Sequence, residues 1–124
     1  MRLEVKQQRD ECGDLEEFSW DLFPIVESTR TRHLDENGLP KPGTKINPGM
    51  IIIGKIGKTR LFDPKRKPSA FEIHEMSFSE LSAKYGPMWR DTSLYASPGT
   101  YGTVKRAFFE DRDGITVAVV DLEG

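Results

Sequence analysis

The apolar run Met50-Ile51-Ile52-Ile53 constrains the fold of this chain more than any other feature. It follows the turn signal Pro48-Gly49, and Ile56 continues the apolar pattern two residues later. Isoleucine favours a strand over a helix, because its β-branched side chain is stiff and suits a pleated sheet. A continuous apolar run between turn signals is typical of a strand buried on both faces. We therefore expect the hydrophobic core to form around this strand.

The composition allows a modest core and excludes few functions. With 124 residues, the chain suits one domain or a piece of a larger protein. The hydrophobic fraction of 36% is low, although the 11 glycines bring the apolar total near the usual range. The net charge of −2 favours no class of partner, so local patches of charge must be weighed separately.

Two sequence features predict where the chain resides. Cys12 is the only cysteine, which excludes an internal disulfide and favours a reducing compartment. Residues Met1 to Asp10 are charged and lack the apolar segment of a signal peptide, and no apolar run approaches the ~18 residues of a membrane span. We expect a cytoplasmic chain that makes no membrane contact.

Several other segments carry patterns of secondary structure. Alternation in Arg2 to Lys6 predicts a strand, and the acidic stretch Asp10 to Asp21 predicts a solvated loop. Residues Ile25 to Leu34 predict a short helix, whereas Tyr101 to Leu122 surround an Asp113-Gly114 turn signal and predict a β-hairpin. Large apolar groups near a proline are expected to anchor the N-terminal arm against a neighbouring surface: Phe18, Trp20, Leu22 and Phe23.

The best-defined helix signal lies between Ser77 and Gly86. Ser77 and Glu80 have the spacing of a capping box, in which each side chain accepts a hydrogen bond from the other residue's backbone amide. Gly86 is a typical residue at a helix C-terminus. Three large side chains share one face of this helix: Phe78, Leu81 and Tyr85. That face can cover the core of the chain itself or bind a partner, for which aromatic anchors are common.

A cluster of basic residues follows the central strand: Lys55, Lys58, Arg60, Lys65, Arg66 and Lys67. It can form a solvated loop or follow a nucleic-acid backbone, where each neutralised phosphate releases counterions. The residues alone leave both alternatives equally open. Gly57-Lys58-Thr59 suggests the end of a phosphate-binding loop, but that motif needs a glycine at position 52, which is Ile52. A nucleotide-binding loop is therefore excluded.

No constellation of residues predicts catalysis. The chain has no Cys-x-x-Cys or His-x-x-x-His pair, and its carboxylates lie in expected loops. We expect neither a cofactor nor a metal. A lipoyl- or biotinyl-like carrier domain is the alternative from another functional class, although the expected hairpin tip from Asp111 to Gly114 has no lysine for modification.

Three separated segments resemble the β subunit of bacterial RNA polymerase: Leu34-Asp35-Glu36-Asn37-Gly38, then Gly43 to Lys55, and then Asp91-Thr92-Ser93-Leu94 with Gly102-Thr103-Val104 after a turn. The resemblance covers about residues 9–110, and the order and spacing of the segments are more specific than any one of them. It implies the flap, or wall, region of that subunit.

In that family the flap forms one side of the RNA exit channel, and its tip helix docks sigma factor region 4 and elongation factors. By position, the resemblance implies a tip helix at Ser77 to Gly86 with these partner-facing residues: Phe78, Leu81, Ser82 and Tyr85. It implies other polymerase subunits and nascent RNA as further partners, and we predict sequence-tolerant contact between the basic cluster and a nucleic-acid backbone. The family's catalytic residues lie elsewhere, so the chain is not expected to be an enzyme on its own.

We therefore predict a mostly β (α+β) fold, a small barrel-sandwich-like β domain with a short tip helix on a projecting arm. The single domain would comprise an acidic and aromatic arm (1–33), the central strand and basic loop (34–66), the tip-helix arm (67–90) and a β-hairpin (91–124). We expect it to be a fragment of a longer protein.

Overall fold

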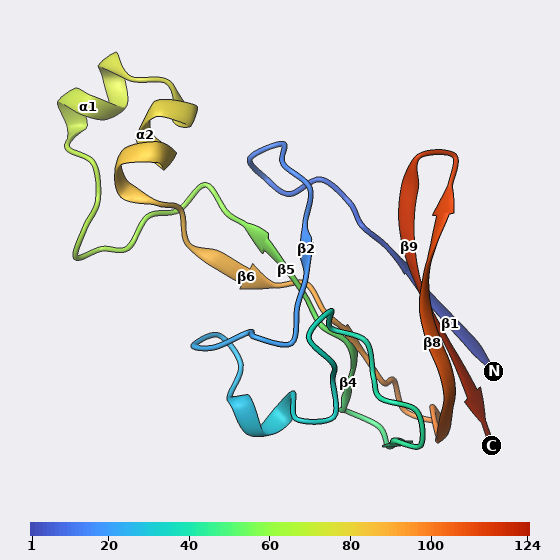
Figure 1. Cartoon of the computed structure of the whole chain (residues 1–124). Helices are drawn as coiled ribbons and strands as arrows, with labels where there is room; N and C mark the ends of the chain where they lie inside the picture. Colours follow the sequence, from blue (N-terminus) through green and yellow to red (C-terminus); the bar gives the residue numbers. More distant parts are fainter.

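The computed structural model describes residues 1–124 and contains three antiparallel sheets and two short α-helices (Figure 1). The largest sheet has the strand order β1-β9-β8-β3, with bounds Arg2–Lys6, Ile115–Glu123, Gly102–Arg112 and Lys45–Ile46. The second has the order β2-β5-β6, with bounds Glu17–Phe18, Lys55–Lys58 and Trp89–Asp91. The third pairs β4, Ile51–Ile53, with β7, Leu94–Tyr95. The prediction of a mostly β fold is confirmed, and the sheets do not close into a barrel.

The β8–β9 hairpin forms the longest pairing in the molecule, as its sequence predicts. Its turn contains Asp113 with φ of 54° and Gly114 with φ of 83°, which is the left-handed geometry that a two-residue hairpin turn needs. The N-terminal strand β1 extends this sheet by pairing with β9, so that Leu3 lies opposite Val120.

The central run of isoleucines is buried on both sides. Ile52 and Ile53 lie in the main core with side chains of the hairpin such as Val120, whereas Ile51 lies in a smaller cluster with Leu22. Burial of adjacent residues in different clusters requires apolar contacts on both faces of the strand, which confirms the prediction from the sequence.

The apolar run does not form one continuous strand, however. It divides at Gly54 into β4 and β5, which belong to different sheets. The backbone of Ser19 crosses at this point, and a Cβ on Gly54 would lie 2.1 Å from the Ser19 carbonyl oxygen. Glycine alone permits so close an approach, so Gly54 fixes where the N-terminal arm crosses the central strand.

The prediction of a helix from Ile25 to Leu34 is wrong. Only a single 3-10 turn, Ser28–Arg30, forms there. β-branched residues lower helix propensity in this segment, and the buried Thr31 donates its hydroxyl to the Ser28 carbonyl at 3.2 Å. The segment instead follows the surface of the small core around Val26 and Leu34.

Both α-helices belong to a projecting arm. Strands β5 and β6 lead away from the hairpin, and α1 (Ala70–Glu75) and α2 (Phe78–Tyr85) lie beyond their far end (Figure 1). We call residues 59–88 the helical arm and the remainder the β body. Neither helix is long or apolar enough to cross a membrane.

Candidate partner-binding arm and groove

Each helix of the arm begins with a capping box. In α2, Ser77 Oγ accepts a hydrogen bond from the Glu80 amide at 3.2 Å, and the Glu80 carboxylate accepts one from the Ser77 amide at 3.3 Å. Gly86, with φ of 74°, ends the helix. These features confirm the helix predicted between Ser77 and Gly86. In α1, Ser69 and Glu72 make the same pair of bonds at 3.2 and 3.1 Å. The sequence analysis missed α1, although the Ser-x-x-Glu spacing could have revealed it.

The predicted partner face of α2 is turned toward the arm itself. Leu81 is only 5% exposed. The Phe78 ring centroid lies 5.6 Å from that of Phe62, and the Tyr85 ring is 6.3 Å from the same residue. Ser82 Oγ is buried without a hydrogen-bond partner. The structure therefore gives these side chains a role in holding the arm together, and contact with a partner stays a prediction.

Glu72 of α1 joins the two helices. Its carboxylate accepts hydrogen bonds from Lys84 Nζ at 2.8 Å and from the Tyr85 hydroxyl at 2.5 Å. The hydrogen bond from Lys84 has the largest effect on the pKa of Glu72 and that from Tyr85 the next largest, and together they lower this pKa to about 2. The same carboxylate raises the pKa of both Lys84 and Tyr85. One ionised side chain thus caps α1 and binds α2.

Exposed apolar side chains of the arm lie on α1 and in the segment that precedes it. Phe71 is 74% exposed, Ile73 is 59% exposed, and Leu61 is 65% exposed. Exposure of several large apolar groups within one short arm is typical of an interaction surface.

Lys55 differs from the rest of the basic cluster because it is buried. Its Nζ lies 2.6 Å from Glu16 Oε1, and the two residues are 4% and 6% exposed. Burial alone raises the pKa of Glu16, but hydrogen bonds from Lys55 and from the Gln8 amide outweigh it and leave that pKa lowered. Lys55 cannot reach a nucleic-acid backbone in this arrangement, because the ammonium group lies in the interior.

Two further cations of the cluster hold the acidic N-terminal segment. Lys58 Nζ pairs with Asp14, which raises the pKa of Lys58, and the Lys58 amide donates to Asp10 at 3.1 Å. Arg60 donates from Nε to the Glu11 carbonyl at 3.1 Å. The sequence predicted that the segment from Asp10 to Asp21 is a solvated loop. In the structure the segment is instead anchored to β5 and to Arg60 by these contacts.

The remaining cations are free of such pairing. Lys65, Arg66 and Lys67 are exposed, and none of them forms an ion pair within the chain. The predicted cluster is thus divided by the structure into three cations bound to the acidic segment and three open to solvent.

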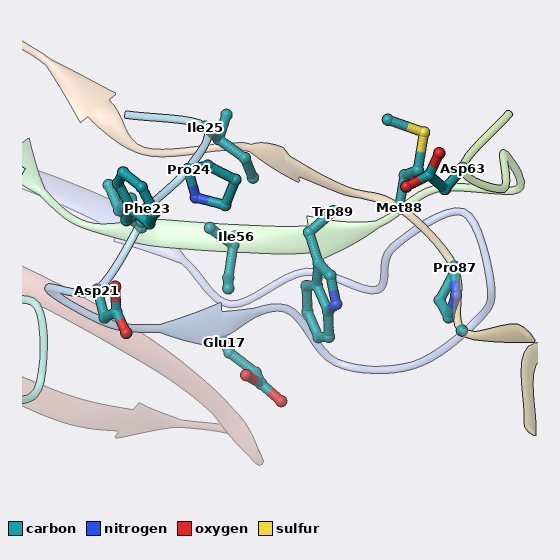
Figure 2. Close-up of a pocket in the computed structure, with 12 residues that line it drawn as sticks. Glu17, Asp21, Phe23, Pro24, Ile25, Ile56, Asp63, Pro87, Met88 and Trp89 are labelled. Carbon is teal, nitrogen blue, oxygen red and sulfur yellow. The ribbon is translucent and has the colours of Figure 1, made fainter. Parts of the chain in front are cut away.

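A groove of about 490 Å³ crosses the sheet β2-β5-β6 at the base of the arm (Figure 2). Ile56 and Trp89 form its floor, the segment from Phe23 to Ile25 forms one side, and Pro87 and Met88 lie at the other. Three carboxylates also line it: Glu17, Asp21 and Asp63.

The predicted anchor residues near Pro24 have different roles in the structure. Leu22 anchors its segment in the smaller core, as expected, and is 2% exposed. Phe23, however, is 68% exposed and lines the groove. The sequence could not show that Trp89, distant in the chain, lies on the same surface. No group of three or more potential metal ligands occurs in the chain.

Comparison with known proteins identifies the family of this chain. The family model described as RNA polymerase Rpb2, domain 6, matches residues 2–122. The chain belongs to this family. It is 34% identical over 100 residues to the DNA-directed RNA polymerase subunit beta of Phocaeicola vulgatus and 33% identical over 100 residues to that of Brucella canis.

Each of these alignments covers 81% of this chain but only 7% of the relative. The chain therefore corresponds to a small segment of the β subunits that it matches. The predicted resemblance to the polymerase β subunit is confirmed at this level, and its assignment to the flap stays a prediction.

Proposed function

We propose that this chain is the flap segment of an RNA polymerase β subunit and serves DNA-templated transcription as a docking element rather than as a catalyst. It would line the RNA exit channel in the cytoplasm, among the other polymerase subunits, and bind sigma factor region 4 and elongation factors. The observation that carries the proposal is the helical arm, which projects on the β5–β6 ribbon and exposes Phe71 and Ile73 beyond it (Figure 1).

We assign the docking contact to α1 rather than to the inward face of α2. Phe71 and Ile73 are available without any rearrangement, whereas Leu81 is buried and Tyr85 is hydrogen-bonded to Glu72. Burial of aromatic and aliphatic side chains gives a few residues most of the binding energy at interfaces. A partner that covers α1 would therefore gain affinity and leave the interior of the arm intact.

The double variant Phe71→Ala and Ile73→Ala tests this assignment. We expect its affinity for purified sigma factor region 4, measured by isothermal titration calorimetry, to fall at least about tenfold, because hot-spot truncations commonly cost more than ~1 kcal/mol each. Circular dichroism checks that the helices remain.

The matched control truncates two exposed side chains of the β body, Tyr101→Ala and Ile115→Ala, which are 59% and 43% exposed in the wild-type chain. It should bind like wild type. Equal affinity of the Phe71→Ala and Ile73→Ala variant and the wild type would contradict docking through α1.

The three free cations support a second contact, with the backbone of nascent RNA. Reversing Lys65, Arg66 and Lys67 to glutamate in an assembled polymerase should reduce transcript retention and its dependence on salt, because fewer counterions are released on binding. Unchanged retention across a salt series would remove RNA contact from the proposal. Lys55→Gln is a poor substitute for this test, since it leaves Glu16 buried without its cation.

A further inference from the structure

We propose that the groove on the sheet β2-β5-β6 binds an extended peptide segment in which lysine or arginine alternates with apolar side chains. The groove lies at the base of the arm, on a different surface from Phe71 and Ile73, so this inference does not depend on the docking contact of α1.

The charges on the groove select the chemistry of the occupant. Glu17, Asp21 and Asp63 line it, no lysine or arginine does, and none of these three carboxylates forms an ion pair within the chain. Three carboxylates that precede Glu17 in the acidic segment are, in contrast, paired with cations: Glu11, Asp14 and Glu16. The groove thus carries three carboxylates without a cation from the chain itself, which favours a cationic partner.

The floor and walls of the groove supply apolar contact for the same partner. Trp89 and Ile56 form a continuous floor, and the exposed side chains of Phe23, Ile25 and Met88 surround it (Figure 2). Tryptophan at the centre of a concave apolar surface is a common binding hot spot. A ligand with charge alone would leave this surface uncovered, so apolar residues between the cations are required.

The neighbouring strand explains why the occupant is an extended peptide. β6 is at the edge of its sheet and pairs only with β5. A peptide that adds to such an edge gains main-chain hydrogen bonds, while alternate side chains enter the adjacent pocket. The three carboxylates repel phosphates, and the nearby Lys58 is already paired with Asp14, so a nucleic acid is disfavoured in this groove.

The test is selection of short peptides from a randomised phage-displayed library on the intact chain. Selected peptides should combine lysine or arginine with aromatic or aliphatic residues. Synthesised copies should shift the indole N–H signal of Trp89 in NMR spectra, whereas the signal of Trp20, which does not line the groove, should stay constant. Affinity should fall as the salt concentration rises.

Charge reversal gives the decisive variant. Glu17→Lys with Asp21→Lys should weaken binding of the selected peptides roughly tenfold, because two attractive contacts become repulsive. Glu36→Lys with Glu75→Lys changes the net charge equally at exposed carboxylates outside the groove and should leave affinity within about twofold.

Three results would overturn the proposal. The first is a set of selected peptides with no excess of basic residues, and the second is equal binding of the selected peptides to both double variants. Alternatively, sedimentation could show a dimer of this chain that Phe23→Ala disrupts, which would assign the groove to a second copy.

Discussion

The β body and the helical arm are stabilised in different ways. In the body, segments distant in sequence form one core in which Ile53 and Val120 are completely buried. In the arm, Leu81 is the only buried hydrophobic residue, and order comes from two capping boxes, the Glu72 carboxylate and the contacts of Phe62 with Phe78 and Tyr85. The body is therefore held by extensive apolar burial, and the arm by polar and aromatic contacts between residues of the arm itself.

This difference has a consequence for dynamics. Helices of 6 and 8 residues are too short to be stable alone in water. Segments with few buried apolar contacts open at lower free energy than the core of the same protein. We expect the arm to open locally while the body stays folded, which suits an element that adapts to a partner.

The largest predicted effect is loss of the ion pair in the body. Glu16→Ala leaves the Lys55 ammonium buried without its counter-charge and should lower the free energy of unfolding by about 3–5 kcal/mol. Urea denaturation measures this change. Replacing both partners, with Glu16→Leu and Lys55→Met, should restore most of the stability.

Glu17→Ala is the control for this variant, because Glu17 is adjacent, exposed and unpaired. Its effect should stay within about 0.5 kcal/mol. If Glu16→Ala were as mild as Glu17→Ala, the buried pair would contribute nothing to the body.

A smaller effect is expected from a cap in the arm. Ser77→Ala removes the bond to the Glu80 amide and should destabilise α2 by about 1 kcal/mol. Amide exchange should quicken in the arm and remain unchanged in β8 and β9. Ser79→Ala, at the exposed second position of α2, removes no hydrogen bond of the arm and should leave its exchange nearly unchanged. Faster exchange in the hairpin would show that arm and body unfold together.

The smallest expected effect is the loss of stability of the arm at low pH. The pKa of Glu72 is about 2 in the folded arm against an ordinary value of 4.5, so the ionised form favours the folded state. Its contribution is complete above about pH 4.5 and is lost as the pH falls toward 2. NMR signals of α1 and α2 should weaken in that range.

Glu72→Gln should remove this acid dependence from the arm, whereas Glu75→Gln on the same helix should preserve it. An arm that responds to acid identically in the wild type and in Glu72→Gln would refute the role given to this carboxylate.

The contrast between body and arm also explains what the sequence could predict. Local signals are reliable: the Asp113-Gly114 hairpin, the β1 strand and the Ser77 capping box all form as expected. Burial of the isoleucine run is confirmed for the same reason, because its pattern is contained within a few residues.

Errors arose where a distant segment decides the outcome. Nothing around Lys55 shows that Glu16 will lie beside it, so its local sequence does not distinguish this buried cation from the exposed ones. The amphipathic face of α2 left two alternatives open, coverage within the chain and contact with a partner, and only the tertiary fold shows that Phe62 and α1 contact this face within the arm. The groove joins Phe23 to Trp89, and only the tertiary fold brings them together.

Hydrogen exchange of the intact chain, with and without sigma factor region 4, tests the central claim most directly. Without partner, amides of residues 69–86 should exchange by local opening, faster than those of 102–123. With partner, exchange should slow in the arm and stay unchanged in the hairpin. Two results would contradict the claim that the arm opens separately from the body and binds a partner. One is equal amide exchange in the arm and the hairpin of the free chain, and the other is unchanged exchange in the arm when the partner is added.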